Sequence, residues 1–358
     1  MAEEEVQTVR LVDPPTDGIT GLSFLGTSHL LASSSWDGSL RIHDTGDYGN
    51  NSKLQVSQSL NAGPLLSLAC REDDGTTTLY TGALDGSVQA FDVTTGQVTL
   101  IGKHKAGTAA GNTNSATAAA CSSVGLMPPL VVTAGWDRHL YVWDVRQDNN
   151  KNTAVVTVDL PGKAFCMDVD PLHSRVAVGC SGRQTCLVDV RRPDQTVTAE
   201  LGLQGESSQK HQTRCLRFFP DGQRIAVGSV EGRVAVEWVD GRPLESGTGM
   251  PKEYAFKCHR RNDLVFPVNC IEFHPKYGTF ATGGGDGTVV TWDGFNRKRL
   301  MALPAFGTSV ASLAFSHDGS ALAMASSYTF EEGERDHPRD EIFVRRMLDS
   351  DCQPKSKS

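Results

Sequence analysis

The chain has 358 residues and a formal charge of −8 at pH 7, with 39% hydrophobic and 21% charged residues. These proportions are those of a folded protein with enough apolar residues for a sizeable core, so they exclude disorder for most of the chain. The acidic balance argues against general, charge-driven binding of nucleic acid, which requires a basic face.

The start of the chain and its cysteines bear on location. Residues Met1 to Glu5 are mostly acidic, whereas a secretory signal would be basic and then apolar, and no apolar run approaches the length that crosses a membrane. The nine cysteines are odd in number, irregularly spaced and mostly set inside apolar runs, as expected of buried, reduced thiols. We therefore expect a cytoplasmic or nuclear protein with no membrane partner.

The first strand-like run, Val6 to Val12, has no pairing partner nearby in the sequence. Behind it, one pattern recurs roughly every 50 residues: a small-residue turn with an acid, a short β-type run, and a second acid at a fixed distance. Four copies are clear, namely Asp37 to Asp44, Asp85 to Asp92, Asp137 to Asp144 and Asp286 to Asp293. Two degenerate copies and a final unit follow the same spacing at Ser181 to Val190, Glu231 to Trp238 and Thr308 to Tyr328.

Seven such units predict an all-β fold, a seven-bladed WD-repeat β-propeller that occupies residues 1–348. Alternating apolar residues before the turns suit strands buried between blades, and helical periodicity is absent. We expect Val6 to Val12 to pair with the last blade near Ile342 to Arg345, which closes the ring and leaves no exposed edge. The polar, low-complexity segment 105–120 is predicted to be a loop insert, and the tail 349–358 to be disordered.

The turn acids and one histidine are interpreted as structural. Asp-Gly and Glu-Gly supply the positive φ that tight β-turns require, and a turn carboxylate can accept backbone N–H bonds. The acids concerned are Asp37, Asp85, Asp137 and Asp286. His104, at a blade entrance, is expected to bind a turn aspartate within a buried network. The alternative is that His104, His211 and His259 form acid–base pairs with nearby aspartates.

Catalytic chemistry is not predicted. No enzyme motif stands out, and no cysteine–histidine cluster has zinc spacing. We therefore expect no metal, no cofactor and no catalysis. A propeller can also carry an enzyme, but this would need convergent polar groups at a pocket mouth, and the sequence offers none.

Two tryptophans and three cations are candidates for binding a partner. Trp36 and Trp136 stand just before turn acids, where a strand reaches the face of the ring, so each either anchors a partner peptide or simply packs. Arg214, Arg233 and Lys257 are predicted to gather on the same face around blades five and six. Such a cluster suits a carboxylate-rich or phosphorylated peptide, and the alternative is solvated surface charge.

Several stretches resemble the WD-repeat propeller of the Bub mitotic checkpoint group, over about Asp17 to Arg346. They include SSSWDGSLRIHD, QTRCLRFFPDG, EGRVAVEWVD, YAFKCHRRND and the ASSY…HP…IFVR ending. The resemblance implies a non-catalytic scaffold of the spindle assembly checkpoint, which is nuclear and at kinetochores in mitosis and also cytoplasmic. Its implied partners are the checkpoint kinase and its pseudokinase relative, bound through GLEBS-type segments, and a kinetochore scaffold with phosphorylated MELT-type repeats. A monomeric propeller in hetero-complexes is implied, without direct binding of nucleic acid.

The resemblance also implies roles for four residues. Arg214 in QTRC would meet acidic residues of the GLEBS-type segment. Arg233 in EGRV and Lys257 in FKCH would read phosphothreonine, with Trp36 beside them. The alternative is the related messenger-RNA export propeller, which shares FKCHR and ASSY and binds a GLEBS segment of a nuclear-pore protein. EGRVAVEW and the short connection Arg261 to Phe266 favour the checkpoint group.

Overall fold

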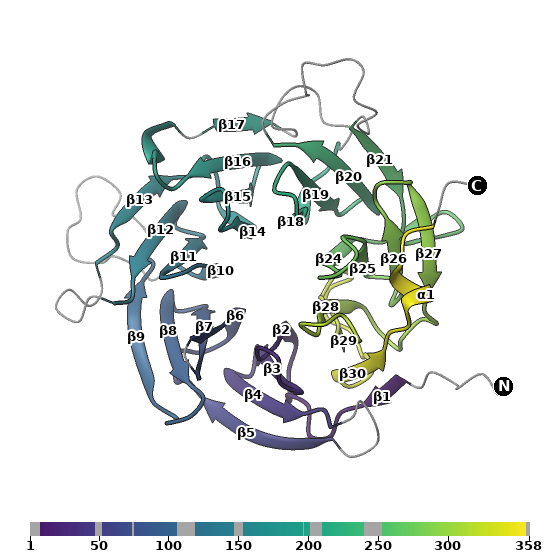
Figure 1. Ribbon diagram of the computed structural model, residues 1–358, viewed down its shortest axis with the longest axis horizontal. Coiled ribbons are helices and arrows are strands. Elements are labelled where there is room, and N and C mark those ends of the chain that lie inside the picture. Colours follow the sequence, from purple (N-terminus) through teal and green to yellow (C-terminus); the bar gives the residue numbers. More distant parts are fainter. Residues whose placement is uncertain are drawn as a thin grey trace.

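The computed structural model describes residues 8–46, 52–73, 75–105, 119–146, 153–195, 197–200, 210–239 and 253–355. Within these ranges, seven four-stranded antiparallel sheets stand around a central axis (Figure 1). The predicted all-β, seven-bladed propeller is confirmed. No helix in the described ranges has the length and apolar character needed to cross a bilayer.

Blades 1 to 6 are each built from four consecutive blade strands, running from the innermost to the outermost position, and blade 7 takes β1 as its outermost strand. Blades 1 and 2 contain β2 (Ile19–Phe24), β3 (Leu30–Ser35), β4 (Ser39–Asp44), β5 (Lys53–Ser59), β6 (Leu65–Asp73), β7 (Thr76–Ala83), β8 (Ser87–Asp92) and β9 (Val98–Lys103). Blades 3 and 4 contain β10 (Cys121–Met127), β11 (Leu130–Gly135), β12 (His139–Asp144), β13 (Val156–Asp159), β14 (Ala164–Asp170), β15 (Arg175–Cys180), β16 (Gln184–Asp189) and β17 (Val197–Glu200), with a 3-10 turn η1 (Pro193–Gln195).

The second half of the ring continues this order. Blades 5 and 6 contain β18 (Thr213–Phe218), β19 (Arg224–Ser229), β20 (Arg233–Trp238), β21 (Tyr254–Lys257), β24 (Val268–Phe273), β25 (Phe280–Gly284), β26 (Val289–Asp293) and β27 (Lys298–Ala302). A small hairpin of β22 (Arg260–Arg261) and β23 (Leu264–Val265) lies between them. Blade 7 contains β28 (Val310–Phe315), β29 (Ala321–Ser326), β30 (Glu341–Arg346) and β1 (Thr8–Arg10).

Strand β1 closes the ring by joining the two ends of the chain in one sheet. It pairs antiparallel with β30, with Thr8 opposite Arg345 and Val9 opposite Val344. The N–H of Leu11 continues the ladder by donating to the carbonyl of Ile342 at 2.8 Å. The expected N-terminal strand therefore lies against the last blade over its described part, while Val6 lies outside the described residues.

The core lies between blades, because each sheet buries both faces against its neighbours. All six residues of β15 (RVAVGC) and of β29 (ALAMAS) are buried. One apolar cluster combines Leu22 and Leu31 of blade 1 with Ala323 and Ile342 of blade 7. Strands covered on both faces read as near-continuous apolar runs, which is why the degenerate repeats remain recognisable.

A β-bulge interrupts the innermost strand of every blade, and a small residue follows it. These residues are Gly21, Ser67, Ser123, Cys166, Cys215, Cys270 and Ser312. Several of them link neighbouring blades: the Ser67 hydroxyl accepts from Val124 N–H at 3.0 Å, and the Ser312 hydroxyl from Leu22 N–H at 3.1 Å. The Cys215 thiol donates to Val268 O at 3.3 Å.

The cysteines of these bulges are structural. All nine cysteines of the chain are free, as predicted, and each is buried or half-buried. Burial raises the pKa of the Cys166 and Cys215 thiols, and that of Cys270 to about 12. Thiols with raised pKa values are poor nucleophiles, so this ring of small residues serves packing between blades.

The expectation of a disordered tail at 349–358 is wrong for its described part. Residues Asp349–Cys352 form a short helix, α1, and Cys352 is buried in an apolar cluster with Leu303 and Met347. The hydroxyl of Thr279 donates to Cys352 O at 2.7 Å, and that of Thr291 to Asp351 O at 2.8 Å. These bonds attach the segment to blade 6. Most of the insert, residues 106–118, lies outside the described residues.

Candidate functional site

The turn acids hold blades together through two copies of one buried network. In blade 3, His104 Nδ1 lies 3.0 Å from the Asp137 carboxylate, and its Nε2 lies 2.9 Å from the Thr133 hydroxyl. In blade 6, His259 Nδ1 lies 2.8 Å from Asp286 and its Nε2 2.9 Å from Thr282. Trp143 and Trp292 each donate to the same threonine of their blade. Every polar atom of both imidazole rings is therefore engaged in structure.

The other two turn acids serve their own turns. Asp37 accepts the N–H groups of Thr16 and Ser39 at 2.9 and 2.8 Å. Burial alone would raise the pKa of Asp37, but these hydrogen bonds hold it below its ordinary value. Asp85 accepts the N–H of Ser87 and the ammonium group of Lys103, both at 2.9 Å.

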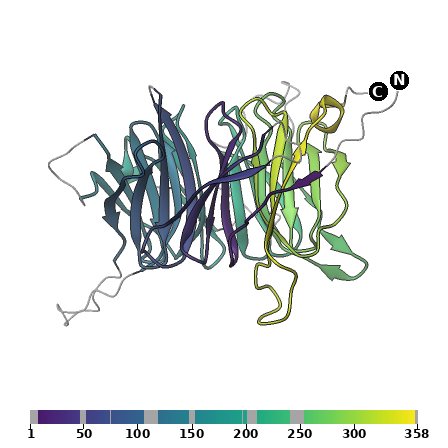
Figure 2. The same ribbon diagram turned by 90° about the horizontal axis from the view of Figure 1, so that it is seen from below.

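A cavity of about 840 Å³ opens at one end of the ring, and all seven blades line it. Four of its aromatic side chains are unusually exposed, namely Trp36 (42%), Trp136 (36%), Phe165 (40%) and Phe330 (65%). Its rim is completed by the connection between β29 and β30, which projects from this face in the side view (Figure 2). We call this cavity the rim pocket.

Trp36 and Trp136 reach the rim pocket for the same local reason. The N–H of Trp36 donates to Gly18 O at 2.8 Å, and that of Trp136 to Ala120 O at 2.9 Å. Each bond fixes the last residue before a hairpin turn beside the innermost strand, so the indole lies at the pocket. The sequence position before the turn acid thus predicts this location correctly.

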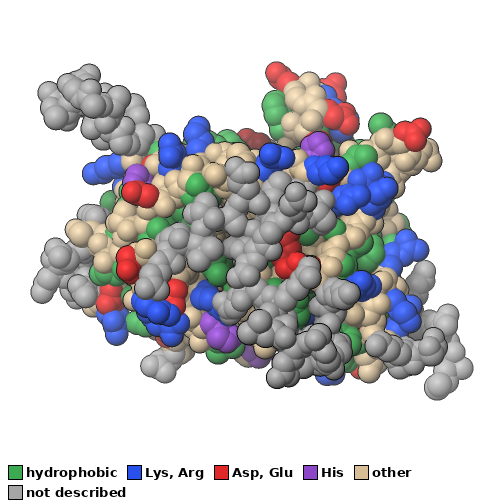
Figure 3. Space-filling view, turned by 90° about the horizontal axis from the view of Figure 1, so that it is seen from above, with side chains coloured by type: hydrophobic (Ala, Val, Ile, Leu, Met, Phe, Trp, Pro, Cys, Tyr) green, Lys and Arg blue, Asp and Glu red, His purple; other side chains and the backbone are tan. Residues whose placement is uncertain are grey.

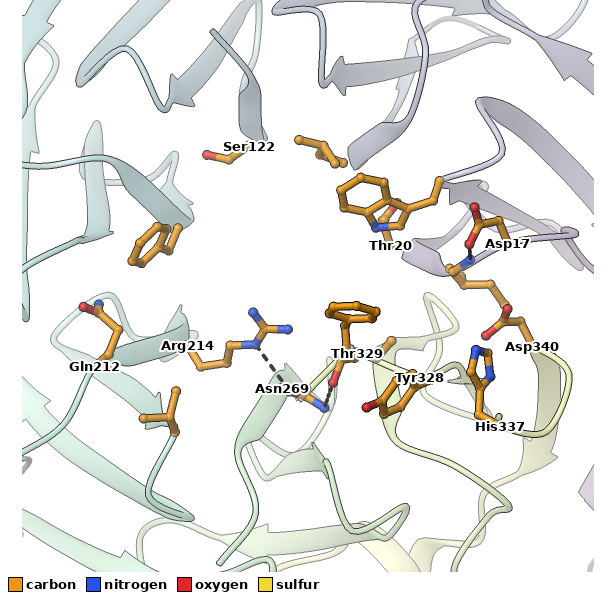
Figure 4. Close-up of a pocket in the computed structure, with 18 of the residues that line it drawn as sticks. Asp17, Thr20, Ser122, Gln212, Arg214, Asn269, Tyr328, Thr329, His337 and Asp340 are labelled. Carbon is orange, nitrogen blue, oxygen red and sulfur yellow. Dashed lines mark hydrogen bonds between the residues drawn. The ribbon is translucent and has the colours of Figure 1, made fainter. Parts of the chain in front are cut away.

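Arg214 lies in the rim pocket at the start of the innermost strand of blade 5 (Figure 4). Its Nε donates to Asn269 Oδ1 at 3.3 Å. Asn269 in turn donates to Val310 O at 3.2 Å and to the Thr329 hydroxyl at 3.3 Å. This chain crosses blades 5, 6 and 7 and fixes the guanidinium group, whose terminal nitrogens bond no described residue.

Arg233 and Lys257 face each other on the outer strands of the same blade. Their Cα atoms are direct partners in the β20–β21 ladder. Neither side chain makes an ion pair with a described acid. The turn acid Glu231 is engaged by the N–H of Lys210 at 3.3 Å and by His211 at 3.7 Å.

The structure separates the four partner-binding candidates into two groups. Trp36, from blade 1, and Arg214, from blade 5, both line the rim pocket, whereas Arg233 and Lys257 do not. The expectation that Trp36 lies beside Arg233 and Lys257 is therefore wrong. Blades 1 and 5 are not neighbours, and strands β20 and β21 stand at the periphery of the ring (Figure 1).

Most lining residues were not anticipated from the sequence, and three of them stand out. Phe165 and Phe330 are exposed aromatic residues of the pocket, and Asp340 is a buried acid of its wall. Phe330 has a φ of 60°, which is uncommon for a bulky residue. Its position two residues after the ASSY stretch was the available signal.

A second cavity, of about 410 Å³, lies at the other ends of the same innermost strands. Its main charged groups satisfy one another: Arg217 bonds Asp168 at 3.0 Å and Glu272 at 2.8 Å. Asp168 also accepts the N–H of Phe218 at 2.7 Å. This cluster is therefore explained by its contacts between blades.

Comparison with known proteins identifies the family. The WD domain, G-beta repeat, matches residues 6–44 and 252–293. Over 94% of its length the chain is 40% identical to the mitotic checkpoint protein bub3 of Dictyostelium discoideum, covering 93% of that protein. It is 38% identical to the mitotic checkpoint protein bub-3 of Caenorhabditis elegans, over 97% of the chain and 95% of that protein. The chain belongs to the Bub3 family of mitotic checkpoint WD-repeat proteins.

The Bub3 family has near relatives in messenger-RNA export. The poly(A)+ RNA export protein of Schizosaccharomyces pombe is 32% identical over 91% of this chain and 85% of that protein. The predicted resemblance to the checkpoint group, with an export propeller as close relative, is confirmed. Both groups consist of WD-repeat propellers, so the comparison agrees with a binding platform.

Proposed function

We propose that this Bub3-family chain is a non-catalytic scaffold of the spindle assembly checkpoint with two peptide sites on one propeller. The rim pocket binds GLEBS-type segments of the checkpoint kinase and its pseudokinase relative. Arg233 and Lys257 bind phosphothreonine in MELT-type repeats of a kinetochore scaffold. The protein thereby recruits the kinases to kinetochores in mitosis, and it is also present in the nucleus and cytoplasm.

The pairing of Arg233 with Lys257 is the observation that carries this proposal. Like charges directly opposite each other in a sheet are destabilising, so such a pair is expected to have a compensating anion. No described acid supplies it, because Glu231 is engaged by Lys210 and His211. A phosphate with several acceptor oxygens would satisfy both cations through charge-assisted hydrogen bonds.

The rim pocket supports the GLEBS-type site. Exposed aromatic side chains around a cavity are typical anchors for a peptide, and a fixed arginine with free terminal nitrogens suits a carboxylate. Trp36 and Arg214 provide one of each on the same cavity. Arg233 and Lys257 are not among the residues that line this pocket, which is compatible with a second peptide site.

The test is calorimetry with two peptides and two variants. Replacing both Arg233 and Lys257 with glutamate should abolish binding of a phosphorylated MELT-type peptide and leave a GLEBS-type peptide bound. Arg214→Glu should do the opposite. Lys103→Glu is the matched control, because Lys103 holds the equivalent strand position in blade 2. Equal affinity of the wild type for phosphorylated and unphosphorylated MELT-type peptide would refute the phosphate site.

Messenger-RNA export is the second candidate, because the 32% identical relative is a poly(A)+ RNA export protein. In that case the GLEBS-type segment would belong to a nuclear-pore protein. A pulldown from mitotic extract, analysed by mass spectrometry, separates the two. Kinetochore kinases among the captured proteins support the checkpoint role, and pore proteins without kinases support export.

A further inference from the structure

The rim pocket contains an acidic group whose partner is missing from the described structure. Asp340 stands just before β30 and is only 9% exposed. Its Oδ1 is buried and has no hydrogen-bond partner among the described residues. Burial of an unpaired carboxylate oxygen is costly, so such an atom in a pocket wall indicates a ligand that donates to it.

The surroundings of Asp340 are acidic. Asp17 and His337 lie beside it in the pocket, on the side away from the strand that carries Arg214 (Figure 4). Asp17 Oδ1 accepts the N–H of Gly18 at 2.7 Å. The β29–β30 connection adds exposed acids, and acidic side chains gather on a lobe of this face (Figure 3). These are Glu331, Glu332, Glu334 and Asp336.

The start of the β29–β30 connection is held by hydrogen bonds of its own side chains and of Ser309. The Thr329 hydroxyl donates to Glu331 at 2.8 Å, Ser309 also donates to Glu331, and the Tyr328 hydroxyl donates to Gly333 O at 2.9 Å. Arg335, a cation of this connection, is paired with Glu332 and lies over the Tyr328 ring. Arg335 is thus engaged by Glu332 and Tyr328, and no ion pair joins it to Asp340 among the described residues.

We propose that the rim pocket is bipolar, and that Asp340, assisted by Asp17, binds the basic side chain of the same peptide whose acidic residue meets Arg214. This inference rests on the proposed peptide-binding function of the pocket. Exposed aromatic side chains of the same pocket, among them Trp36 and Phe330, would hold the apolar part of the peptide. A peptide with separated acidic and basic residues can then bind in only one direction, because the reversed peptide places like charges together.

A basic side chain of the peptide is the cation proposed here. Among the described residues, no group of three or more His, Cys, Asp or Glu side chains is suited to hold a metal ion. A guanidinium or ammonium group brings several N–H donors on a flexible stem and can reach a recessed carboxylate past aromatic walls.

The test is calorimetry with Asp340→Asn, using Asp336→Asn as the matched control. Asp336 lies in the same connection and is exposed, so its replacement removes the same charge without touching the pocket wall. The probe is the GLEBS-type peptide, together with a set of peptides in which each lysine or arginine is replaced by glutamine in turn. Loss of one charge-assisted hydrogen bond corresponds to a roughly tenfold or greater loss of affinity.

We expect Asp340→Asn to weaken binding of the parent peptide by about tenfold or more, and Asp336→Asn to weaken it by less than about twofold. One of the glutamine peptides should bind wild type and Asp340→Asn with the same affinity. The lysine or arginine replaced in that peptide is then the residue that Asp340 binds. Asp17→Asn should show a smaller loss coupled to the same peptide residue, and it serves as the second variant if Asp340→Asn does not fold.

Two results would overturn the inference alone: equal effects of Asp340→Asn and Asp336→Asn, or a loss that is the same for every glutamine peptide. The first would reflect only the general field of the acidic face, and the second an indirect change of the pocket. A wild-type protein that binds no GLEBS-type peptide would instead overturn the proposed function, and this inference with it.

Discussion

Blades 2 and 5 place equivalent residues in the same geometry and use them differently. In blade 2, Lys103 is opposite Ser87 in the outer ladder, and the turn acid Asp85 neutralises it at 2.9 Å. In blade 5, Lys257 is opposite Arg233, and the turn acid Glu231 is bonded elsewhere. The lysine of blade 2 is therefore neutralised by its own turn acid. In blade 5 the turn acid is bonded to Lys210 and His211, and the two cations have no described acidic partner.

The largest expected effect is the loss of stability when a fully buried turn acid, that of blade 3, is removed. In Asp137→Ala, the imidazole of His104 loses its carboxylate partner. The loss is costly because both side chains are 0% exposed. We expect the free energy of unfolding to fall by about 3 kcal/mol, as for the breaking of a buried pair. Urea unfolding followed by circular dichroism measures it.

The control for that experiment is Asp85→Ala. The side chains of Asp85 and Lys103 are 41% and 39% exposed, so the loss of their pair should cost no more than about 1 kcal/mol. Equal losses in the two variants would show that turn acids act through the turn alone and not through burial of a partner.

The next effect concerns the cationic edge of blade 5. Lys257→Ala should weaken a phosphorylated MELT-type peptide about tenfold, because one charge-assisted hydrogen bond is lost. Lys103→Ala should leave that affinity unchanged, since Lys103 is neutralised within its blade. Fluorescence anisotropy with a labelled phosphopeptide measures both. An equal loss in Lys103→Ala would mean that the phosphate is attracted by general surface charge.

A smaller effect follows from the protonation of Asp286. Burial alone would raise the pKa of Asp286, but hydrogen bonds and charge from His259 hold it below its ordinary value of 3.8. A carboxyl with a lowered folded pKa stabilises the protein above its unfolded pKa, and this contribution is lost as the pH falls through the folded pKa. We expect stability to decline below about pH 4, and less steeply in Asp286→Asn. Urea unfolding midpoints of the wild type and of Asp286→Asn, measured across this pH range, test the idea. The same dependence on pH in both proteins would contradict it.

The smallest effect is a gain. Without a bound anion, Arg233 and Lys257 repel each other across the ladder, so Lys257→Gln should stabilise the free protein by a few tenths of a kcal/mol, roughly 0.5 at most. Paired urea titrations of wild type and variant, at low ionic strength, measure the difference. A clear loss of stability in Lys257→Gln would indicate that Lys257 already has a partner within the chain.

The ring and part of the site could be predicted from the sequence, because both depend on the local repeat. The turn acids set the blade boundaries, and the residue before each turn, such as Trp36, is delivered to the rim by hairpin geometry. The grouping of Trp36 with Arg233 and Lys257 could not be predicted, since it depends on how far apart blades 1 and 5 stand after closure.

Two features missed by the sequence depend on long-range contacts of irregular segments. Phe330 and Asp340 belong to a connection whose path is set by bonds to Ser309 and Asn269 from other parts of the chain. The tail reads as polar, but its backbone carbonyls accept from Thr279 and Thr291 of blade 6, and composition does not reveal such bonds. Periodicity predicts what repeats, and these segments do not repeat.

The closure of blade 7 by β1 and β30 has a consequence for how the protein is made. The first strand to leave the ribosome must wait for nearly the last one before the ring is complete, since Thr8 pairs with Arg345. The rim pocket takes residues from every blade, from Trp36 in the first to Phe330 in the last. A chain interrupted before blade 7 lacks the residues that this blade gives to the pocket, so the complete pocket exists only in finished molecules.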